Sequence, residues 1–211
     1  MSDARAQDLT VGPDGVPRCG WPGLHHADYR DYHDREWGKP VHGESALLER
    51  LCLEGFQSGL SWLVILRKRP GFRRAFAGFD PEVVADYTED DVRRLLTDES
   101  IVRNRRKIEA TIANARATLA LREHGGLEEL MWTHAPEPTP RPRHFADVPT
   151  QTAESELLAR RLRKAGFEQV GPTTLYAAMQ ACGLVDDHLV GCFRAGSSRS
   201  GVRPTEMRAT S

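Results

Sequence analysis

Hydrophobic residues along most of this chain recur at intervals of three and four positions, which is the spacing of one face of an α-helix. Leu47, Leu51 and Glu54 follow this spacing, and a longer stripe runs through residues 108–119. No stretch alternates between apolar and polar residues as a half-buried β-strand does, and no segment is repeated. The pattern therefore predicts an all-α protein.

Turn and capping residues divide this pattern into separate helices. Asp80 followed by Pro81 is typical of a helix start, and Thr152 is predicted to begin a later helix that ends at Gly166. Five prolines in residues 135–149 indicate an extended loop before that later helix.

The length and composition fit one soluble globular domain, or two small intertwined ones. The 211 residues are 39% hydrophobic and 28% charged, and no apolar run approaches the roughly 18 residues of a membrane-spanning helix. Residues 1–17 and 196–211 are polar and contain Gly, Pro or Ser, so we expect a disordered lead, a domain over residues 18–195 and a disordered tail. The absence of a signal sequence predicts a cytoplasmic protein.

The net charge of −1 conceals a strong segregation of charges along the chain. Basic residues gather in residues 67–74, 103–107 and 160–164, while residues 80–91 carry six acidic side chains and no basic one. Basic stretches of this kind can follow a phosphate backbone even in a protein of neutral net charge. Each stretch alone is more simply a solvated helix face, so the charges favour nucleic acid only if other features agree.

Two pairs of metal-binding residue types lie near opposite ends of the chain. Cys19 and His33 form the first pair, and His188 and Cys192 form the second, four positions apart as on one face of a helix. Two thiolates and two imidazoles would complete the tetrahedral shell of a structural zinc ion, one per chain, with no open position for chemistry. The alternative is that the four residues are unrelated. The other two cysteines follow helical spacing as core residues.

Glu54 shares a helical face with apolar residues that should point inward, where an unpaired carboxylate is costly. Such acids often mark binding or catalytic sites, although structural pairing would explain one equally well. Six aromatic residues lie nearby in the sequence, at Trp21, Tyr29, Tyr32, Trp37, Phe56 and Trp62. Aromatic walls with one carboxylate suit a flat, cationic ligand such as a nucleobase. An aromatic-rich core is the alternative for some of the six.

Five short motifs follow one another in order from about residue 18 to residue 192: C-G-W, Y-H-D-R-E-W-G, L-E-G-F-Q-S-G-L-S-W, Q-A-C-G-L-V-D-D-H and H-L-V-G-C. Together they resemble the bacterial 3-methyladenine DNA glycosylase I family. The resemblance implies the fold of the helix-hairpin-helix glycosylase superfamily, with a structural zinc that joins the N- and C-terminal segments. It also implies a monofunctional enzyme of base-excision repair, which flips 3-methyladenine out of DNA and hydrolyses its N-glycosidic bond.

The resemblance assigns roles to residues by their place in the motifs. The implied zinc ligands are Cys19, His33, His188 and Cys192. Glu54 matches the catalytic, base-recognising glutamate, and the residues that match the walls of the base pocket are Trp21, Tyr29, Tyr32 and Trp62. Leu60, preceded by Gly59, matches the residue that fills the gap left by the flipped base.

The superfamily's hairpin corresponds to F-E-Q-V-G-P-T-T, residues 167–174. A glycine turn before a helix presents backbone N–H groups to a phosphate, which the helix dipole also attracts. Gly171 would be that glycine, with hydroxyl contacts from Thr173 and Thr174 and a charge contact from Lys164 just upstream. We therefore expect a monomer that binds double-stranded DNA and does not bind membranes.

Asp186 departs from the pattern of the family. Many helix-hairpin-helix glycosylases resemble one another in having a catalytic aspartate two residues before a histidine or a similar residue, and the family that this chain resembles lacks it. Here Asp186 precedes His188 by two positions. It could orient water or stabilise an oxocarbenium-like sugar, but the simpler interpretation is an N-cap of the helix predicted to carry His188 and Cys192.

Two other functions remain open on the sequence alone. A nucleobase-binding or damage-binding protein without activity could use the same pocket, although the pocket glutamate and aromatic residues disfavour it. A hydrolase that uses zinc directly is disfavoured because four protein ligands leave no place for a zinc-bound water.

Overall fold

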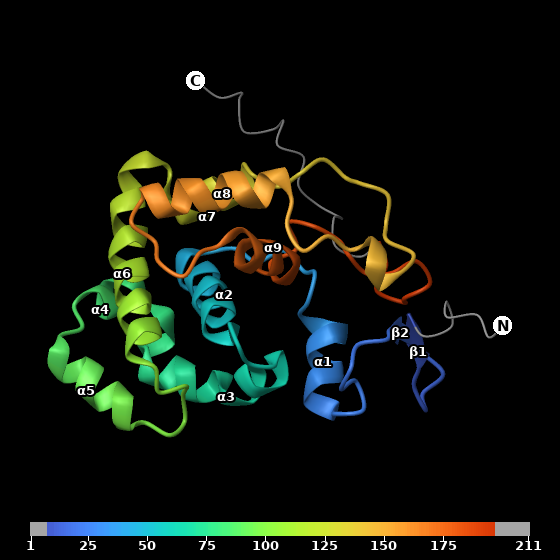
Figure 1. Ribbon diagram of the computed structural model, residues 1–211, viewed down its shortest axis with the longest axis horizontal. Coiled ribbons are helices and arrows are strands. Elements are labelled where there is room, and N and C mark those ends of the chain that lie inside the picture. Colours follow the sequence, from blue (N-terminus) through green and yellow to red (C-terminus); the bar gives the residue numbers. More distant parts are fainter. Residues whose placement is uncertain (1–7, 197–211) are drawn as a thin grey trace.

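The fold is built around one buried helix. The computed structural model describes residues 8–196, so residues 1–7 of the predicted lead and residues 197–211 of the predicted tail lie outside the described residues. Within this range α2 (Glu44–Gln57) lies at the centre (Figure 1), and every residue of α2 from Leu47 to Phe56 is buried. Its neighbours are α3 (Trp62–Ala75), α6 (Arg105–Leu121), α7 (Gly126–Trp132) and α9 (Pro172–Ala181).

The remaining helices extend this core. They are α1 (Ala27–Arg35), which packs on α3; α4 (Pro81–Ala85) and α5 (Glu89–Thr97), which pack on α6; and α8 (Ala153–Lys164), which packs on α9. Short 3-10 turns lie at η2 (Ala77–Phe79), η3 (Arg122–His124) and η4 (Phe145–Asp147). The predicted helical architecture is confirmed for the described residues, and none of their helices is long and apolar enough to cross a membrane.

The predicted helix boundaries carry the expected capping contacts. The Asp80 carboxylate accepts a hydrogen bond from the first turn of α4, in which Pro81 is the first residue. The Thr152 hydroxyl does the same for α8. Gly166 follows the end of α8 with φ of 97°, a left-handed conformation that glycine adopts without strain.

A short antiparallel hairpin precedes the helices, where the sequence predicted disorder and no strand. Strand β1 (Leu9–Val11) pairs with β2 (Pro17–Cys19). Arg18 fixes the hairpin to α1, because its guanidinium donates to the carboxylates of Asp14 and Asp34 at 2.7 Å each. The prediction was wrong for this segment because strands of three residues are too short to show alternation and depend on such distant contacts.

The chain after α9 forms turns, which corrects the helix predicted for His188 and Cys192. Gly183 and Gly191 both have positive φ, 74° and 95°, and such values interrupt a right-handed helix. His188 and Cys192 therefore come together through a turn and not through a shared helical face.

Candidate functional site

Four side chains from distant parts of the chain meet in one buried cluster. Cys19, His33, His188 and Cys192 each place a donor atom within 4.8 Å of the others. Cys192 Sγ lies 3.6 Å from both His33 Nε2 and His188 Nδ1. Cys19 Sγ lies 3.7 Å from His188 Nδ1. A tetrahedral zinc ion with ordinary bond lengths requires sulfur-to-nitrogen distances of about 3.6 Å, so the four predicted ligands fit such an ion.

Each imidazole of the cluster is oriented through its other ring nitrogen. His33 Nδ1 lies 2.8 Å from the Asp34 carboxylate, and His188 Nε2 lies 3.3 Å from the Trp37 carbonyl oxygen. An acceptor at one ring nitrogen holds the proton there and leaves the opposite nitrogen free to bind a metal. The cluster therefore has the donor set, the spacing and the orientation of a structural metal site.

A cavity of about 220 Å³ lies next to the cluster. Its lining includes all five residues that the sequence assigned to base recognition, namely Trp21, Tyr29, Tyr32, Glu54 and Trp62. The other lining residues are Trp37, Gln57, Phe145, Val148, Ala177, Gln180 and Asp187. Helices α1, α2, α3 and α9 thus each contribute at least one residue to one site.

Aromatic rings form the walls of this cavity. The ring centroids of Tyr32 and Trp62 are 5.2 Å apart, and those of Trp21 and Tyr29 are 5.5 Å apart. Trp21 also meets His33 edge to face at 4.9 Å, so part of the wall packs directly on the cluster of two cysteines and two histidines. The Trp62 indole N–H is buried without a hydrogen-bond partner in the described part of the chain, which leaves a donor for a ligand.

Glu54 is a buried carboxylate without a hydrogen-bonded partner among residues 8–196. Glu54 is only 7% exposed, and this burial raises its pKa to about 8. Arg50 lowers that pKa only in part, since its guanidinium donates to Glu36 at 3.0 Å. A cationic ligand in the cavity would favour the ionised form of Glu54 and lower its pKa. The site therefore suits a flat ligand that carries positive charge.

We expect the Glu54→Gln variant to be more stable than the wild-type chain at alkaline pH. The raised pKa of about 8 means that Glu54 binds a proton on folding between the unfolded pKa, about 4.3, and pH 8. The wild-type free energy of unfolding therefore falls as pH rises through this window, whereas the amide has no such dependence. The gain should be on the order of 4 kcal/mol at pH 8 and about 1 kcal/mol at pH 5. Thermal melts measure it, and equal gains at both pH values would contradict the raised pKa.

Asp186 and Asp187 have different surroundings. The Asp186 carboxylate pairs with Arg141 at 3.0 Å and does not line the cavity. Its other carboxylate oxygen accepts a hydrogen bond from the His188 backbone N–H at 3.3 Å. This contact lies in a turn, so the prediction that Asp186 is a helix N-cap was wrong. Asp187 does line the cavity, and its Oδ2 accepts hydrogen bonds from Tyr176 and Gln180 at 2.7 Å each.

The loop that carries Gly59 and Leu60 extends beyond the end of α2. Gly59 has φ of 83°, and Leu60 is 41% exposed, unlike most leucines of the chain. The Lys107 ammonium holds this loop, because it donates to the carbonyl oxygens of Phe56 and Ser58 at 2.8 and 2.7 Å. Lys107 is therefore a helix-end contact and not the exposed cation that its basic stretch suggested.

The turn between α8 and α9 is clamped by Asn114 of α6. The Asn114 amide accepts from the Glu168 N–H at 2.7 Å and donates to the Glu168 carbonyl at 3.2 Å. Gly171 is the N-cap of α9, so Thr173 and Thr174 lie in the first turn, where backbone N–H groups lack helical partners. The predicted hairpin residues thus lie together at one helix start.

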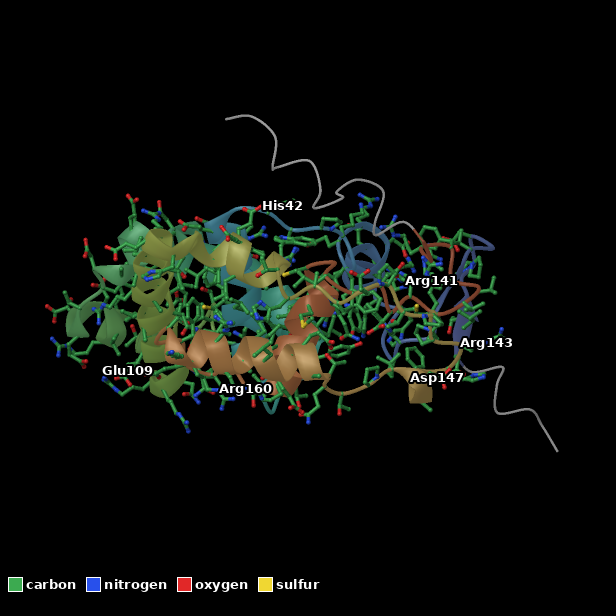
Figure 2. The ribbon with its side chains drawn as sticks, turned by 90° about the horizontal axis from the view of Figure 1, so that it is seen from above. His42, Glu109, Arg141, Arg143, Asp147 and Arg160 are labelled. Atoms are coloured by element: carbon green, nitrogen blue, oxygen red, sulfur yellow. The ribbon has the colours of Figure 1, made fainter. Side chains whose placement is uncertain are left out.

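In two of the three basic stretches, several of the cations pair with acidic residues of the same chain. Ion pairs to acidic residues occur in residues 67–74 at Arg67, Arg69 and Arg73, and in residues 103–107 Arg105 pairs with Glu89 at 3.0 Å. Residues 160–164 differ, since one long pair of 3.8 Å from Arg160 is found there among the described residues. Figure 2 shows Arg160 at the outer face of α8. This stretch keeps the most charge available for a partner.

Sequence reasoning did not identify Asn114, Asp187 or Phe145. Asn114 interrupts an otherwise apolar stripe and is 2% exposed, and a polar residue at such a position is a usable signal. Asp187 stands next to an identical residue, so only the turn geometry distinguishes the two. Phe145 lies in the proline-rich loop, which has no periodicity to interpret.

Comparisons with known proteins agree on one group. A family model for methyladenine glycosylase matches residues 21–195. DNA-3-methyladenine glycosylase 1 of Escherichia coli (strain K12) is 45% identical over 181 residues, covering 84% of this chain and 96% of that protein. A crystal structure of 3-methyladenine DNA glycosylase I superposes with a TM-score of 0.80 at 44% identity, over 83% of this chain and 98% of that one. A variant of such an enzyme in complex with 3-methyladenine gives 0.79 at 33% identity, over 84% and 97% of the two chains.

Proposed function

The chain belongs to the methyladenine glycosylase family, and we propose that it removes 3-methyladenine from alkylated DNA by hydrolysing the N-glycosidic bond. One observation carries the proposal, the buried and unpaired Glu54 in a cavity with aromatic walls. The similar solved structure with 3-methyladenine bound supports this class of ligand. Release of free base from methylated duplex DNA tests it, because a binding protein without activity would release none.

The substrate itself supplies much of the driving force. Methylation at N3 gives adenine a positive charge and makes it a good leaving group, so the enzyme needs little acid catalysis. Its main work is to take the base out of the helical stack, at a cost of a few kcal/mol that damage lowers. Once the base is held between aromatic rings, the bond between the sugar carbon C1′ and the base nitrogen N9 breaks, and the base leaves as a neutral molecule with the electron pair of that bond. Water bonds to C1′ and releases one proton to the solvent.

Glu54 selects the damaged base by its charge. The carboxylate accepts hydrogen bonds from the adenine edge and stabilises the cationic base electrostatically. Tyr32 and Trp62 add stacking and cation–π attraction. Normal adenine lacks the positive charge, so it gains less from the site and its glycosidic bond is less reactive. Asp187, the second acid in the cavity, is placed to orient the attacking water.

The buried cluster of two cysteines and two histidines holds a structural zinc ion in this proposal. The support is its donor set and its spacing. Because all four ligands come from the protein, zinc adds stability and takes no part in the reaction. It ties the segment before α1 to the turns after α9.

The α8–turn–α9 unit is the helix-hairpin-helix that binds the DNA backbone. The helix start at Gly171 receives a phosphate, with Thr173 and Thr174 as further donors. Leu60, exposed on its loop, fills the space that the extracted base leaves. Lys164, just before the hairpin, adds charge.

We expect Lys164→Ala to weaken binding to duplex DNA and to reduce its salt dependence. Loss of one phosphate contact should lower the slope of log K against log salt by about 0.9. Arg105→Ala is the matched control, because Arg105 comes from a basic stretch but is paired with Glu89 at 3.0 Å. Fluorescence anisotropy at several salt concentrations measures both slopes. Equal effects of the two substitutions would remove the α8 stretch from the DNA interface.

A further inference from the structure

The cavity has one wall that comes from outside the helices. Phe145 lines it from η4, within the long proline-rich loop, and is 37% exposed. Val148, three residues later, lines the same cavity. An aromatic ring that is partly open to solvent at the edge of a cavity with aromatic walls can add a stacking surface for a planar ligand.

A carboxylate from the N-terminal segment holds this loop in place. One oxygen of Asp8 accepts a hydrogen bond from the Phe145 backbone N–H at 3.1 Å, and the other lies 2.5 Å from His144 Nδ1. The Asp8 carbonyl accepts from Gly20 N at 2.7 Å, which fixes Asp8 beside the end of β2. Asp147 closes the turn of η4 by accepting from the backbone of His144 at 2.9 Å.

Apolar contacts support the same arrangement. Leu9 of β1 and Val148 of the loop both pack on the buried group formed by Cys19, Leu189 and Cys192. Figures 1 and 2 both show η4 beside the strands β1 and β2. The hairpin and the loop thus rest on a common base, and the polar contacts of Asp8 set the position of Phe145 above it.

We propose that Phe145 is a further binding residue of the pocket, a stacking surface for the extracted purine, and that Asp8 is the residue that positions it. This inference rests on the proposed function. Asp8 lies before residue 21, where the family match begins. The residue that holds Phe145 in place therefore belongs to a segment outside the matched region. The ligand that Phe145 serves is a methylated purine, which is cationic while joined to the sugar and neutral once released, and whose flat face favours an aromatic ring in both states.

Calorimetric titration of free 3-methyladenine into the full-length protein tests the proposal. Phe145→Ala should weaken binding about five- to tenfold through lost stacking, and Asp8→Ala about threefold. Asp8→Asn keeps an acceptor for the Phe145 N–H and should stay within about twofold of wild type. Val11→Ala is the control, because Val11 lies on the same hairpin, is 64% exposed and does not line the cavity.

A double substitution separates positioning from general damage to the fold. In a Phe145→Ala background, Asp8→Ala should cost no further affinity if it acts through Phe145. Additive losses, or a Phe145→Ala variant that binds as wild type does, would overturn the inference. The proposed function would fail differently, because then the wild-type protein itself would neither bind 3-methyladenine nor release it from DNA.

Discussion

Replacing Glu54 by glutamine is expected to slow excision of 3-methyladenine by about 10²-fold, while the affinity for undamaged DNA stays unchanged. The amide keeps the shape and one acceptor but removes the negative charge that favours a cationic base. The carboxylate is buried and accepts no hydrogen bond from the described residues, and the charge of Arg50 compensates it only in part, so much of the effect of the charge should fall on the ligand. Single-turnover excision kinetics measure the loss.

Asp186→Asn is the matched comparison, because the same carboxylate-to-amide change is made outside the cavity. Asp186 is paired with Arg141 at 3.0 Å, so this variant should keep excision within a few-fold of wild type. The excision rate of Trp62→Ala should lie between the rates of these two variants, because the substitution removes stacking worth roughly 1–3 kcal/mol. Full turnover in Glu54→Gln would remove that residue from the mechanism. A stable but inactive Asp186→Asn variant would place the catalytic carboxylate there instead.

The pH profile gives an independent check on Glu54. Burial raises its pKa to about 8 in the empty pocket, and the base in DNA is cationic because it is methylated, without taking up a proton. The wild-type value of kcat/KM should therefore rise with pH up to about 8 and then level off. Glu54→Gln should lose this rise.

The second large effect is expected at the proposed zinc site, the buried cluster of two cysteines and two histidines. Cys192→Ala should lower the free energy of unfolding by several kcal/mol, because a metal bound by residues 19 and 192 closes most of the chain into one loop. Elemental analysis should find one zinc per wild-type chain and almost none in the variant. In the proposed mechanism the metal takes no part in breaking the glycosidic bond, so the rate of excision at low temperature should fall less than the stability does.

Cys182→Ala is the control for a change of buried cysteine. Cys182 is buried but is not part of the cluster, so its loss should cost only packing, roughly 1 kcal/mol, with zinc content unchanged. Denaturant unfolding of both variants compares the two costs. A wild-type protein that is free of metal and equally stable would contradict the zinc assignment.

The sequence predicted what depends on residue type and spacing. Helical periodicity placed Glu54 on a buried face, and residue chemistry selected the four side chains that gather in the cluster. It failed where contacts between distant segments decide the structure. The hairpin at β1 and β2 depends on the ion pair between Arg18 and Asp34, and no local sequence pattern indicates such a pair.

The same limit applies to charge. Lys107 and Lys164 both lie in basic stretches, yet one ammonium caps α2 and the other makes no ion pair with any described residue. Asp186 and Asp187 are chemically identical neighbours, but only Asp187 faces the cavity. Composition can indicate that a partner is charged, whereas the tertiary fold decides which side chains remain available to meet it.

Chromatography of the free bases released from N-methylated duplex DNA tests the central claim most directly. The expected result is 3-methyladenine in molar excess over protein, with undamaged adenine retained in the DNA. The sample should be the full-length protein with its metal content measured and its folding verified by a thermal melt. A folded protein that binds the duplex but releases no 3-methyladenine would contradict the account.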